Sequence, residues 1–173
     1  MNFNKIYKMV IEGHSDQSYG ALRNHYVAHL IMTDLMLLSF FPERYNDDTR
    51  AAALLHDYIE DAAENWIDNV KLMQANASER TCDLVNVLTE KRINGGNRRH
   101  RQESSYKLIA QDRDAIAIKI SDRLANTYYA CFEDNEKMLS MYRKEMEFFR
   151  TSFYDEDDES IVSAFRRIES HLK

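Results

Sequence analysis

The sequence predicts an all-α protein. Only four of its 173 residues are Gly and one is Pro, so the residues that usually form turns are scarce. Along most of the chain, apolar residues recur three and four positions apart, which is the spacing of one helix face. With 44% hydrophobic residues, the chain is long enough for one domain with its own core, and we expect that domain to span residues 1–173.

The first elements are expected at residues 3–12 and 25–41, on either side of a polar loop at 14–24. Pro42 ends the second of these helices, because proline disfavours helical geometry in the residue before it. The stretch 51–62 contains no Gly or Pro and is rich in Ala and Leu, so we expect one uninterrupted helix there. The run Asn46-Asp47-Asp48-Thr49 just before it offers N-cap residues.

The second half of the chain continues this pattern. Asn65 and Ser78 are plausible N-caps for the next two helices, and Ser78 precedes a run of apolar residues at helical spacing. Acidic residues at 155–159 would favour the positive end of the last helix. The expected helices are 66–73, 78–88, 113–132, 135–150 and 157–171.

Composition excludes some classes of function. No run of 18 apolar residues exists, so we expect no membrane segment and no membrane partner. A net charge of −6 argues against nucleic-acid binding, which needs a basic surface. Cys82 and Cys131 lie within helical patterns and are expected to be reduced core thiols of a cytoplasmic protein. The oligomeric state stays open, because aromatic residues in 128–154 would suit a subunit contact as well as a core.

Residues 89–105 differ from the rest of the chain. This stretch has two adjacent glycines and a basic run, Arg98-Arg99-His100-Arg101. A run of charge is often only a solvated loop. Because arginine side chains match the geometry of phosphate, the same run would also suit a mobile phosphate-contacting loop.

Four polar residues interrupt the apolar faces of separate expected helices, in the order His29, His56-Asp57, Asp122. Each has an ordinary explanation, such as a satisfied core histidine, or a salt bridge from Asp122 to Lys119 or Arg123. Buried charge is costly unless it is paired or bound to a metal. Converging helices can project such side chains onto one ion, and two imidazoles with two carboxylates suit Mn²⁺, Fe²⁺ or Zn²⁺.

The motifs around these residues resemble those of the HD-domain phosphohydrolases. Residues 53–61, Ala-Leu-Leu-His-Asp-x-x-Glu-Asp, and residues 118–126, Ile-Lys-Ile-Ser-Asp-Arg-Leu-Ala-Asn, are similar to segments of the RelA/SpoT hydrolase domain and the small alarmone hydrolases. Residues 25–29, His-Tyr-Val-Ala-His, resemble a third segment, Gln17 falls near a fourth, and 84–89 resemble a segment leading to Val-Thr. The resemblance covers roughly residues 5–150.

This resemblance implies a helical HD-domain fold and a defined set of roles. The metal, Mn²⁺ in the family, would be held by His29, His56, Asp57 and Asp122. Glu60 and Asp61 would orient or deprotonate the attacking water, and Asn126 would position the substrate. The family reaction removes pyrophosphate from the 3′ position of guanosine tetra- or pentaphosphate, the alarmone (p)ppGpp, and the basic residues Arg98, Arg99 and Arg101 fall where the family has a charged mobile loop.

The chain departs from the family where the substrate would bind. The family has an Arg-Lys pair shortly after its His-x-x-Gln motif, whereas this chain has Tyr19 there and a basic residue only at Arg23. Tyr19 would stack on a base and Arg23 would reach a phosphate. After Asn126, the family's basic residue is replaced within Thr127-Tyr128-Tyr129.

Three functions therefore stay open. The leading one is a metal-dependent hydrolase of (p)ppGpp-type nucleotides. The second keeps the metal and changes the substrate, to a deoxynucleotide or a dinucleotide such as NADPH. The third is a nucleotide-binding module without catalysis, although such a module has no need of the Glu60-Asp61 pair.

Overall fold

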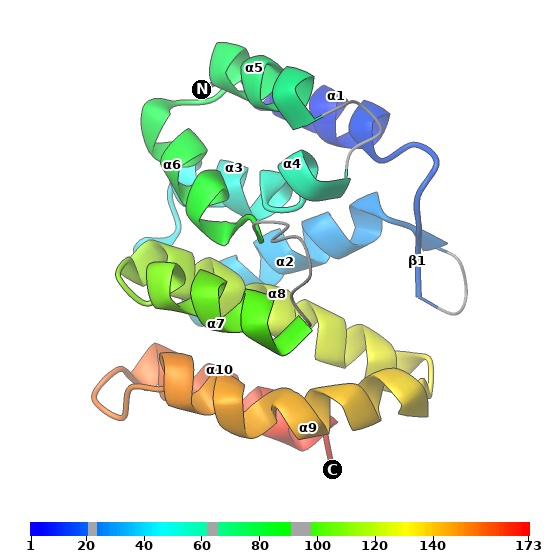
Figure 1. The fold of residues 1–173 in the computed structure, drawn as a ribbon, viewed down its shortest axis with the longest axis vertical. Helices are drawn as coiled ribbons and strands as arrows, with labels where there is room; N and C mark the ends of the chain where they lie inside the picture. The colour runs from blue at the N-terminus through cyan, green and yellow to red at the C-terminus, as the bar shows by residue number, and fades with distance from the viewer. Residues whose placement is uncertain (21–23, 62–65, 91–97) are drawn as a thin grey trace.

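The computed structural model describes residues 1–20, 24–61, 66–90 and 98–173, and within them the protein is all-α as predicted, with one minimal hairpin (Figure 1). The hairpin pairs the two-residue strands β1 and β2 antiparallel, with Ser18 opposite His25. The elements are α1 (Phe3–Gly13), β1 (Ser18–Tyr19), β2 (Asn24–His25), α2 (Val27–Phe40), the 3₁₀ helix η1 (Pro42–Arg44), α3 (Asp47–Leu55), α4 (Tyr58–Asp61), α5 (Trp66–Asn76), α6 (Glu79–Leu88), α7 (Arg98–Ile109), α8 (Arg113–Phe132), α9 (Glu136–Phe153) and α10 (Glu159–His171).

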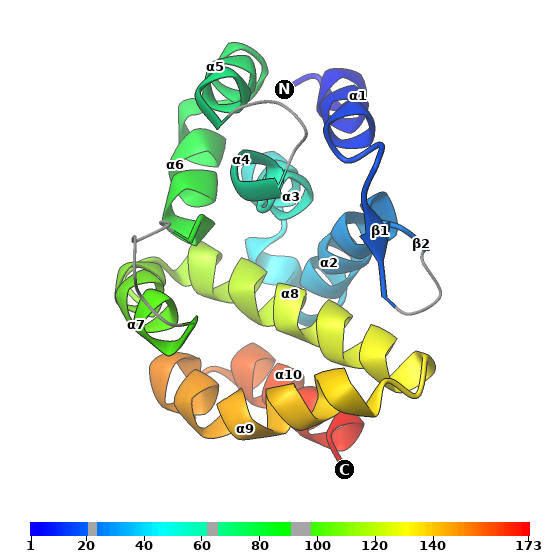
Figure 2. The same cartoon turned by 45° about the vertical axis from the view of Figure 1, so that its right-hand side comes forward.

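Helix α8 runs through the middle of the molecule. Figure 2 shows α2 and α3 on one side of it and α9 and α10 on the other, and α8 contacts all four as well as α6 and α7. Most of its residues are buried, including Asp122 and Arg123. A central helix buried on nearly every side is a position in which a charged residue needs a partner.

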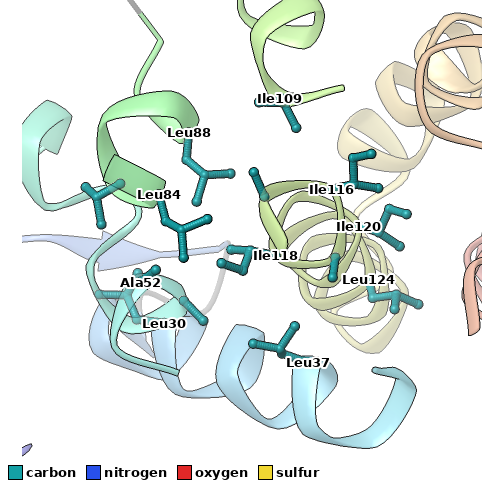
Figure 3. Close-up of a cluster of buried hydrophobic side chains, with 14 of the residues drawn as sticks. Leu30, Leu37, Ala52, Leu84, Leu88, Ile109, Ile116, Ile118, Ile120 and Leu124 are labelled. Carbon is teal, nitrogen blue, oxygen red and sulfur yellow. The ribbon is translucent and has the colours of Figure 1, made fainter. Parts of the chain in front are cut away.

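The core lies between α8 and its neighbours. Figure 3 shows Ile118 of α8 pointing to the side where Leu30 and Leu37 of α2 and Leu84 and Leu88 of α6 gather. These four leucines are buried to 5% exposure or less. Fully burying a side chain of this size contributes about 1.5–3 kcal/mol each, so this packing fixes the positions of α2 and α8 relative to each other.

Side-chain caps begin several helices where the sequence predicted them. Asn46 caps α3 by accepting from the backbone N–H groups of Asp48 and Thr49, in a capping box with Thr49. Ser78 caps α6 through the N–H of Thr81. Both predicted caps are confirmed, and the predicted cap Asn65 lies outside the described residues. Asp158 caps α10, which therefore begins two residues later than predicted.

Two predictions of secondary structure were wrong. Residues 51–62 do not form one helix, because α3 ends at Leu55, His56 and Asp57 form a turn, and α4 begins at Tyr58. The basic run does not belong to a loop, because Arg98 begins α7. The buried face of α7 is spaced as a helix requires, but two of its four positions are polar: Gln102, Ser105, Tyr106 and Ile109.

The structure also tests the predictions about the two cysteines and about a membrane segment. Both cysteines are free thiols, but only Cys82 is buried, so the prediction of a core position was wrong for Cys131. Among the described residues, no helix combines the length and the apolar character that crossing a bilayer requires.

Candidate metal centre

Three segments far apart in the sequence bring the predicted ligands together. His29 lies in the first turn of α2, His56 and Asp57 form the turn between α3 and α4, and Asp122 lies in the middle of α8. The packing of α2 and α3 against α8 places these side chains face to face. We call His29, His56, Asp57 and Asp122 the metal-centre cluster.

The side-chain atoms of the cluster converge. One ligand atom each of His29, His56 and Asp57 lies within 4.8 Å of the others. Asp57 Oδ2 is 3.1 Å from His56 Nε2 and 3.7 Å from His29 Nε2. Asp122 Oδ1 is 3.3 Å from His29 Nε2 and 3.8 Å from His56 Nε2. The structure therefore brings together all four predicted ligands.

The orientation of His56 suits a ligand. Its Nδ1 lies 2.8 Å from the carbonyl oxygen of Ala53, which can only accept a hydrogen bond, so Nδ1 carries the proton. The other nitrogen, Nε2, is buried and has no hydrogen-bond partner among the described residues. A histidine whose outer nitrogen donates to a carbonyl presents a lone pair on the inner nitrogen, as metal-binding histidines do.

Neighbouring donors hold the two carboxylates. Tyr26 donates its hydroxyl to Asp57 Oδ2 at 2.6 Å. Lys119 Nζ donates to Asp122 Oδ2 at 3.0 Å, and Asn126 Nδ2 donates to Asp122 Oδ1 at 2.6 Å. The sequence offered Lys119 or Arg123 as the partner of Asp122, and the structure selects Lys119.

The electrostatics of the cluster favour added positive charge. Burial acts to lower the pKa of His56, but the carboxylates of Asp57 and Asp122 outweigh it and raise that pKa well above its usual range. Burial likewise acts to raise the pKa of Asp122, but Lys119 and the two histidines lower it well below normal. A site that stabilises a proton on buried imidazole is one in which a cation is favoured.

Glu60 lies one turn beyond the cluster on α4. Its side chain accepts a hydrogen bond from the backbone N–H of Glu90. Burial first, and then the nearby charge of Asp57, raises the pKa of Glu60 from 4.5 to about 7. A carboxyl group of this kind is suited to taking up a proton near neutral pH. The backbone of Asp61 ends α4, and its side chain lies outside the described part of the chain.

An aromatic wall covers one side of the cluster. The ring of Tyr19 lies 4.8 Å from that of His29 and 4.4 Å from that of Tyr129, between centroids. The hydroxyl of Tyr19 donates to Asn126 Oδ1 at 2.9 Å. Tyr19 and Asn126 therefore both adjoin the cluster, as predicted for substrate-binding residues, although Tyr19 contacts protein groups here.

Gly20 explains how the hairpin reaches α8. Its φ is +71°, and a Cβ at this position would lie 2.2 Å from the ring of Tyr129 and 2.4 Å from the carboxylate of Glu133. Any side chain would collide with α8, so glycine is required both by conformation and by space. This close approach brings the neighbouring Tyr19 against the cluster.

Of the four basic residues predicted to bind phosphate, the structure describes the side chain of Arg99. Arg99 is half-exposed, pairs with Glu103 at 3.1 Å and lies 3.5 Å from the centroid of the Phe148 ring. Arg23 and the side chains of Arg98 and Arg101 lie outside the described part of the chain. The phosphate-binding role of these residues stays a prediction.

Sequence reasoning missed two residues that serve the cluster. Tyr26 was part of a motif but had no assigned role, and His14, which packs against Tyr26, was not singled out. A signal was present for Tyr26, which lies one helical turn before His29 and therefore on the same face of the chain. A signal was also present for His14, which stands three residues before Gln17 and so has the spacing of the His-x-x-Gln motif.

Two surface hollows lie away from the cluster. One, of about 470 Å³, is lined by Arg44, Arg113 and the acidic residues that precede α10. The other, of about 460 Å³, lies beside Met1 and the start of α3. Neither is lined by a residue of the metal-centre cluster.

The cluster fits a divalent cation. It contributes two imidazoles and two carboxylates, and the buried Nε2 of His56, which has no hydrogen-bond partner in the described part of the chain, faces the carboxylates. Mixed nitrogen and oxygen donors without thiolate suit Mn²⁺, Fe²⁺ or Zn²⁺ and argue against both a thiolate zinc site and an all-oxygen calcium site.

Comparison with known proteins gives a match in fold. The structure is similar to that of a metazoan ortholog of SpoT, a protein that hydrolyses ppGpp and plays a role in starvation responses, with a TM-score of 0.66 and 18% sequence identity. The similarity covers 97% of this chain and 93% of that chain. No protein-family model matches the sequence, and neither does any curated protein. The predicted resemblance to the RelA/SpoT hydrolase domain is thus confirmed at the level of the fold.

Proposed function

We propose that this chain, as one domain over residues 1–173, is a metal-dependent phosphohydrolase that removes the 3′-pyrophosphate from (p)ppGpp-type nucleotides. The observation that carries the proposal is the convergence of His29, His56, Asp57 and Asp122 from three separate segments. The metazoan SpoT ortholog of similar fold, which hydrolyses ppGpp, supports the choice of substrate class.

The four residues of the cluster would hold the cation, with Mn²⁺ as the first candidate and Fe²⁺ or Zn²⁺ as alternatives. When bound, the ion would polarise a phosphoryl oxygen and make a water more acidic. Hydrogen bonds from Tyr26, Lys119 and Asn126 keep the two carboxylates turned toward the histidines. The protein contributes a fixed, largely buried donor set that needs little reorganisation when the ion enters.

Glu60 is our candidate for the group that accepts a proton from the attacking water, with Asp61 as its partner. Its raised pKa lies near neutral pH, where a general base is most effective. Lys119, partly buried beside Asp122, adds fixed positive charge to the site, and such charge would stabilise negative charge that develops on the substrate.

Substrate binding is assigned to Tyr19, Asn126, Arg23, Arg98, Arg99 and Arg101. The partner is a small nucleotide rather than a nucleic acid, because the chain carries a net charge of −6. We place the protein in the cytoplasm, in keeping with two free thiols.

A second substrate class is favoured by one observation. The rings of Tyr19 and Tyr129 lie 4.4 Å apart where the family has basic residues. An aromatic wall of this kind binds a base by stacking and does not require guanine. A deoxynucleotide or a dinucleotide such as NADPH is therefore the alternative substrate, and a non-catalytic nucleotide-binding role is the remaining one.

The test is release of pyrophosphate from ppGpp by the purified protein with Mn²⁺, followed by chromatography of the nucleotide product. We expect GDP as product, and a rate at least about 10²- to 10³-fold lower in His56→Ala and Asp122→Ala. Retained activity in these variants would refute the mechanism. Turnover of a deoxynucleotide or NADPH without turnover of ppGpp would support the alternative substrate. Nucleotide binding without any product would favour the non-catalytic role.

A further inference from the structure

The turn that follows α1 packs against Tyr26 through one buried residue, His14. His14 follows α1 and is fully buried, and its Nδ1 lies 2.7 Å from Oε1 of Gln17. The ring of His14 stacks on that of Tyr26, with centroids 5.0 Å apart and planes 23° from parallel. A polar ring is buried at little cost when it is hydrogen-bonded, so the contact with Gln17 helps to keep His14 in this position.

Backbone hydrogen bonds also hold Tyr26 in place. Its N–H donates to the carbonyl oxygen of Gln17 at 3.2 Å, and its own carbonyl accepts the N–H of His29 at 2.9 Å. Tyr26 is therefore attached to the turn on one side and to a residue of the metal-centre cluster on the other.

The hydroxyl of Tyr26 acts on one particular oxygen. It donates to Asp57 Oδ2, the oxygen that also lies 3.1 Å from His56 Nε2 and 3.7 Å from His29 Nε2. The phenol therefore contacts the oxygen of Asp57 that faces the two imidazoles.

We propose that Tyr26 is a positioning residue for Asp57, and that His14 and Gln17 set the cation affinity of the metal centre by holding Tyr26 in place. The proposal rests on the metal site of the proposed function and is independent of its substrate. Groups that orient metal ligands in this way typically change metal affinity about 10- to 100-fold when removed.

The structure offers a matched control for Tyr26. Tyr45 donates its hydroxyl to Asp34 Oδ1 at 3.0 Å, and Asp34 is a buried carboxylate on the same helix as His29. Tyr45→Phe and Tyr26→Phe therefore remove the same type of hydrogen bond from two aspartates, the buried Asp34 and the partly buried Asp57, of which only Asp57 belongs to the cluster.

The experiment titrates the purified full chain with Mn²⁺ and follows the free ion by electron paramagnetic resonance. We expect Tyr26→Phe to bind Mn²⁺ about 10- to 100-fold more weakly than the wild type, and Tyr45→Phe to bind it as the wild type does. Thermal unfolding of the metal-free proteins, measured in parallel, reports the structural cost of each change.

A second pair of variants tests the role of the turn. His14→Phe keeps an aromatic ring against Tyr26 and removes the hydrogen bond to Gln17, so we expect a several-fold loss of Mn²⁺ affinity. Because His14 acts through Tyr26, the double variant should bind Mn²⁺ no more weakly than Tyr26→Phe alone. If His14→Phe does not fold, Gln17→Met removes the same hydrogen bond from the half-buried partner.

Each outcome decides the matter. Wild-type affinity in Tyr26→Phe, or an equal loss in Tyr45→Phe, overturns the positioning role while leaving the metal site in place. If the losses of Mn²⁺ affinity add up in the double variant, His14 does not act through Tyr26, and only that part of the proposal is overturned. A wild-type protein that binds neither Mn²⁺ nor, in a competition titration, Fe²⁺ or Zn²⁺ refutes the metal site and this inference together, whereas failure to hydrolyse ppGpp affects only the proposed substrate.

Discussion

Two buried carboxylate clusters share helix α2 and differ in where their positive charge comes from. In the first, which we call the Asp34 cluster, Asp34 accepts a hydrogen bond from Tyr45 and lies 3.6 Å from the guanidinium of Arg50. Arg50 is itself held over the ring of Phe3 at 4.3 Å. This cluster carries its counter-charge as a permanent part of the fold.

The metal-centre cluster gathers Asp57 and Asp122 around two histidines, with Lys119 as the neighbouring cation. Burial still raises the pKa of Asp34, whereas Lys119 and the histidines overcome burial and lower the pKa of Asp122. The further positive charge here resides on histidine, where a proton or a metal ion can exchange. The Asp34 cluster is balanced by fixed charge, whereas the metal-centre cluster adds to the fixed charge of Lys119 a counter-charge that can exchange, as a ligand site requires.

The largest expected effect comes from removing the fixed cation of each cluster. Lys119→Met should destabilise the metal-free protein by about 3–5 kcal/mol, because Asp122 is left buried without its ion pair. Saturating Mn²⁺ should stabilise this variant at least as much as it stabilises the wild type. Urea unfolding with and without Mn²⁺ measures both quantities.

Arg50→Met is the matched variant in the Asp34 cluster. This variant should also be less stable than the wild type. Mn²⁺ should raise its free energy of unfolding by no more than it raises that of the wild type, because Asp34 is not a ligand. The distinction between the clusters is wrong if Mn²⁺ stabilises Arg50→Met against unfolding more than it stabilises Lys119→Met.

A smaller effect is expected from the cation itself. Mn²⁺ at 100 times its dissociation constant should stabilise the wild-type protein by about 2.7 kcal/mol, and a chelator should reverse the change. Asp122→Asn should lose this increment. Asp34→Asn should unfold at a lower temperature yet keep the increment, and a loss of the increment in both variants would show that the two clusters are not distinct.

The smallest effect concerns pH. In the metal-free protein the pKa of Glu60 is raised from 4.5 to about 7, so between these values the folded protein binds more protons than the unfolded chain. The free energy of unfolding should therefore fall as pH rises from 5 to 8, by on the order of 2 kcal/mol from this group.

Glu60→Gln removes this contribution and keeps an acceptor for the N–H of Glu90. The variant should be less sensitive to pH over this range, and the exposed Glu147→Gln should behave as the wild type. Identical pH profiles for Glu60→Gln and Glu147→Gln would contradict the assignment.

Much of the fold followed from the sequence because its signals were local. Residues 113–132 carry apolar residues at helical spacing, and α8 has these bounds. Asn46 and Ser78 cap helices as their side chains predict. The metal-centre cluster was predicted from polar residues on apolar helix faces together with the resemblance of the motifs around them, and the structure brings the four side chains together.

The rest depended on contacts that no local pattern contains. Ala and Leu favour a continuous helix through His56, yet the chain turns there, where His56 bonds to the carbonyl of Ala53 and Asp57 accepts from Tyr26. Helix α7 escaped detection because Gln102 and Ser105 occupy half of its buried face. Hydrophobic periodicity cannot reveal a face that is buried through polar residues.

The length of helix α3 sets the positions of His56 and Asp57. Its first turn is fixed by the capping box at Asn46, and its last residue, Leu55, is followed at once by His56 and Asp57. Deleting one residue from a helix turns everything beyond it by about 100° and shifts it by about 1.5 Å. Substitutions within α3 that preserve volume are therefore tolerable, but insertions and deletions are not, because they would turn both ligands away from α2 and α8.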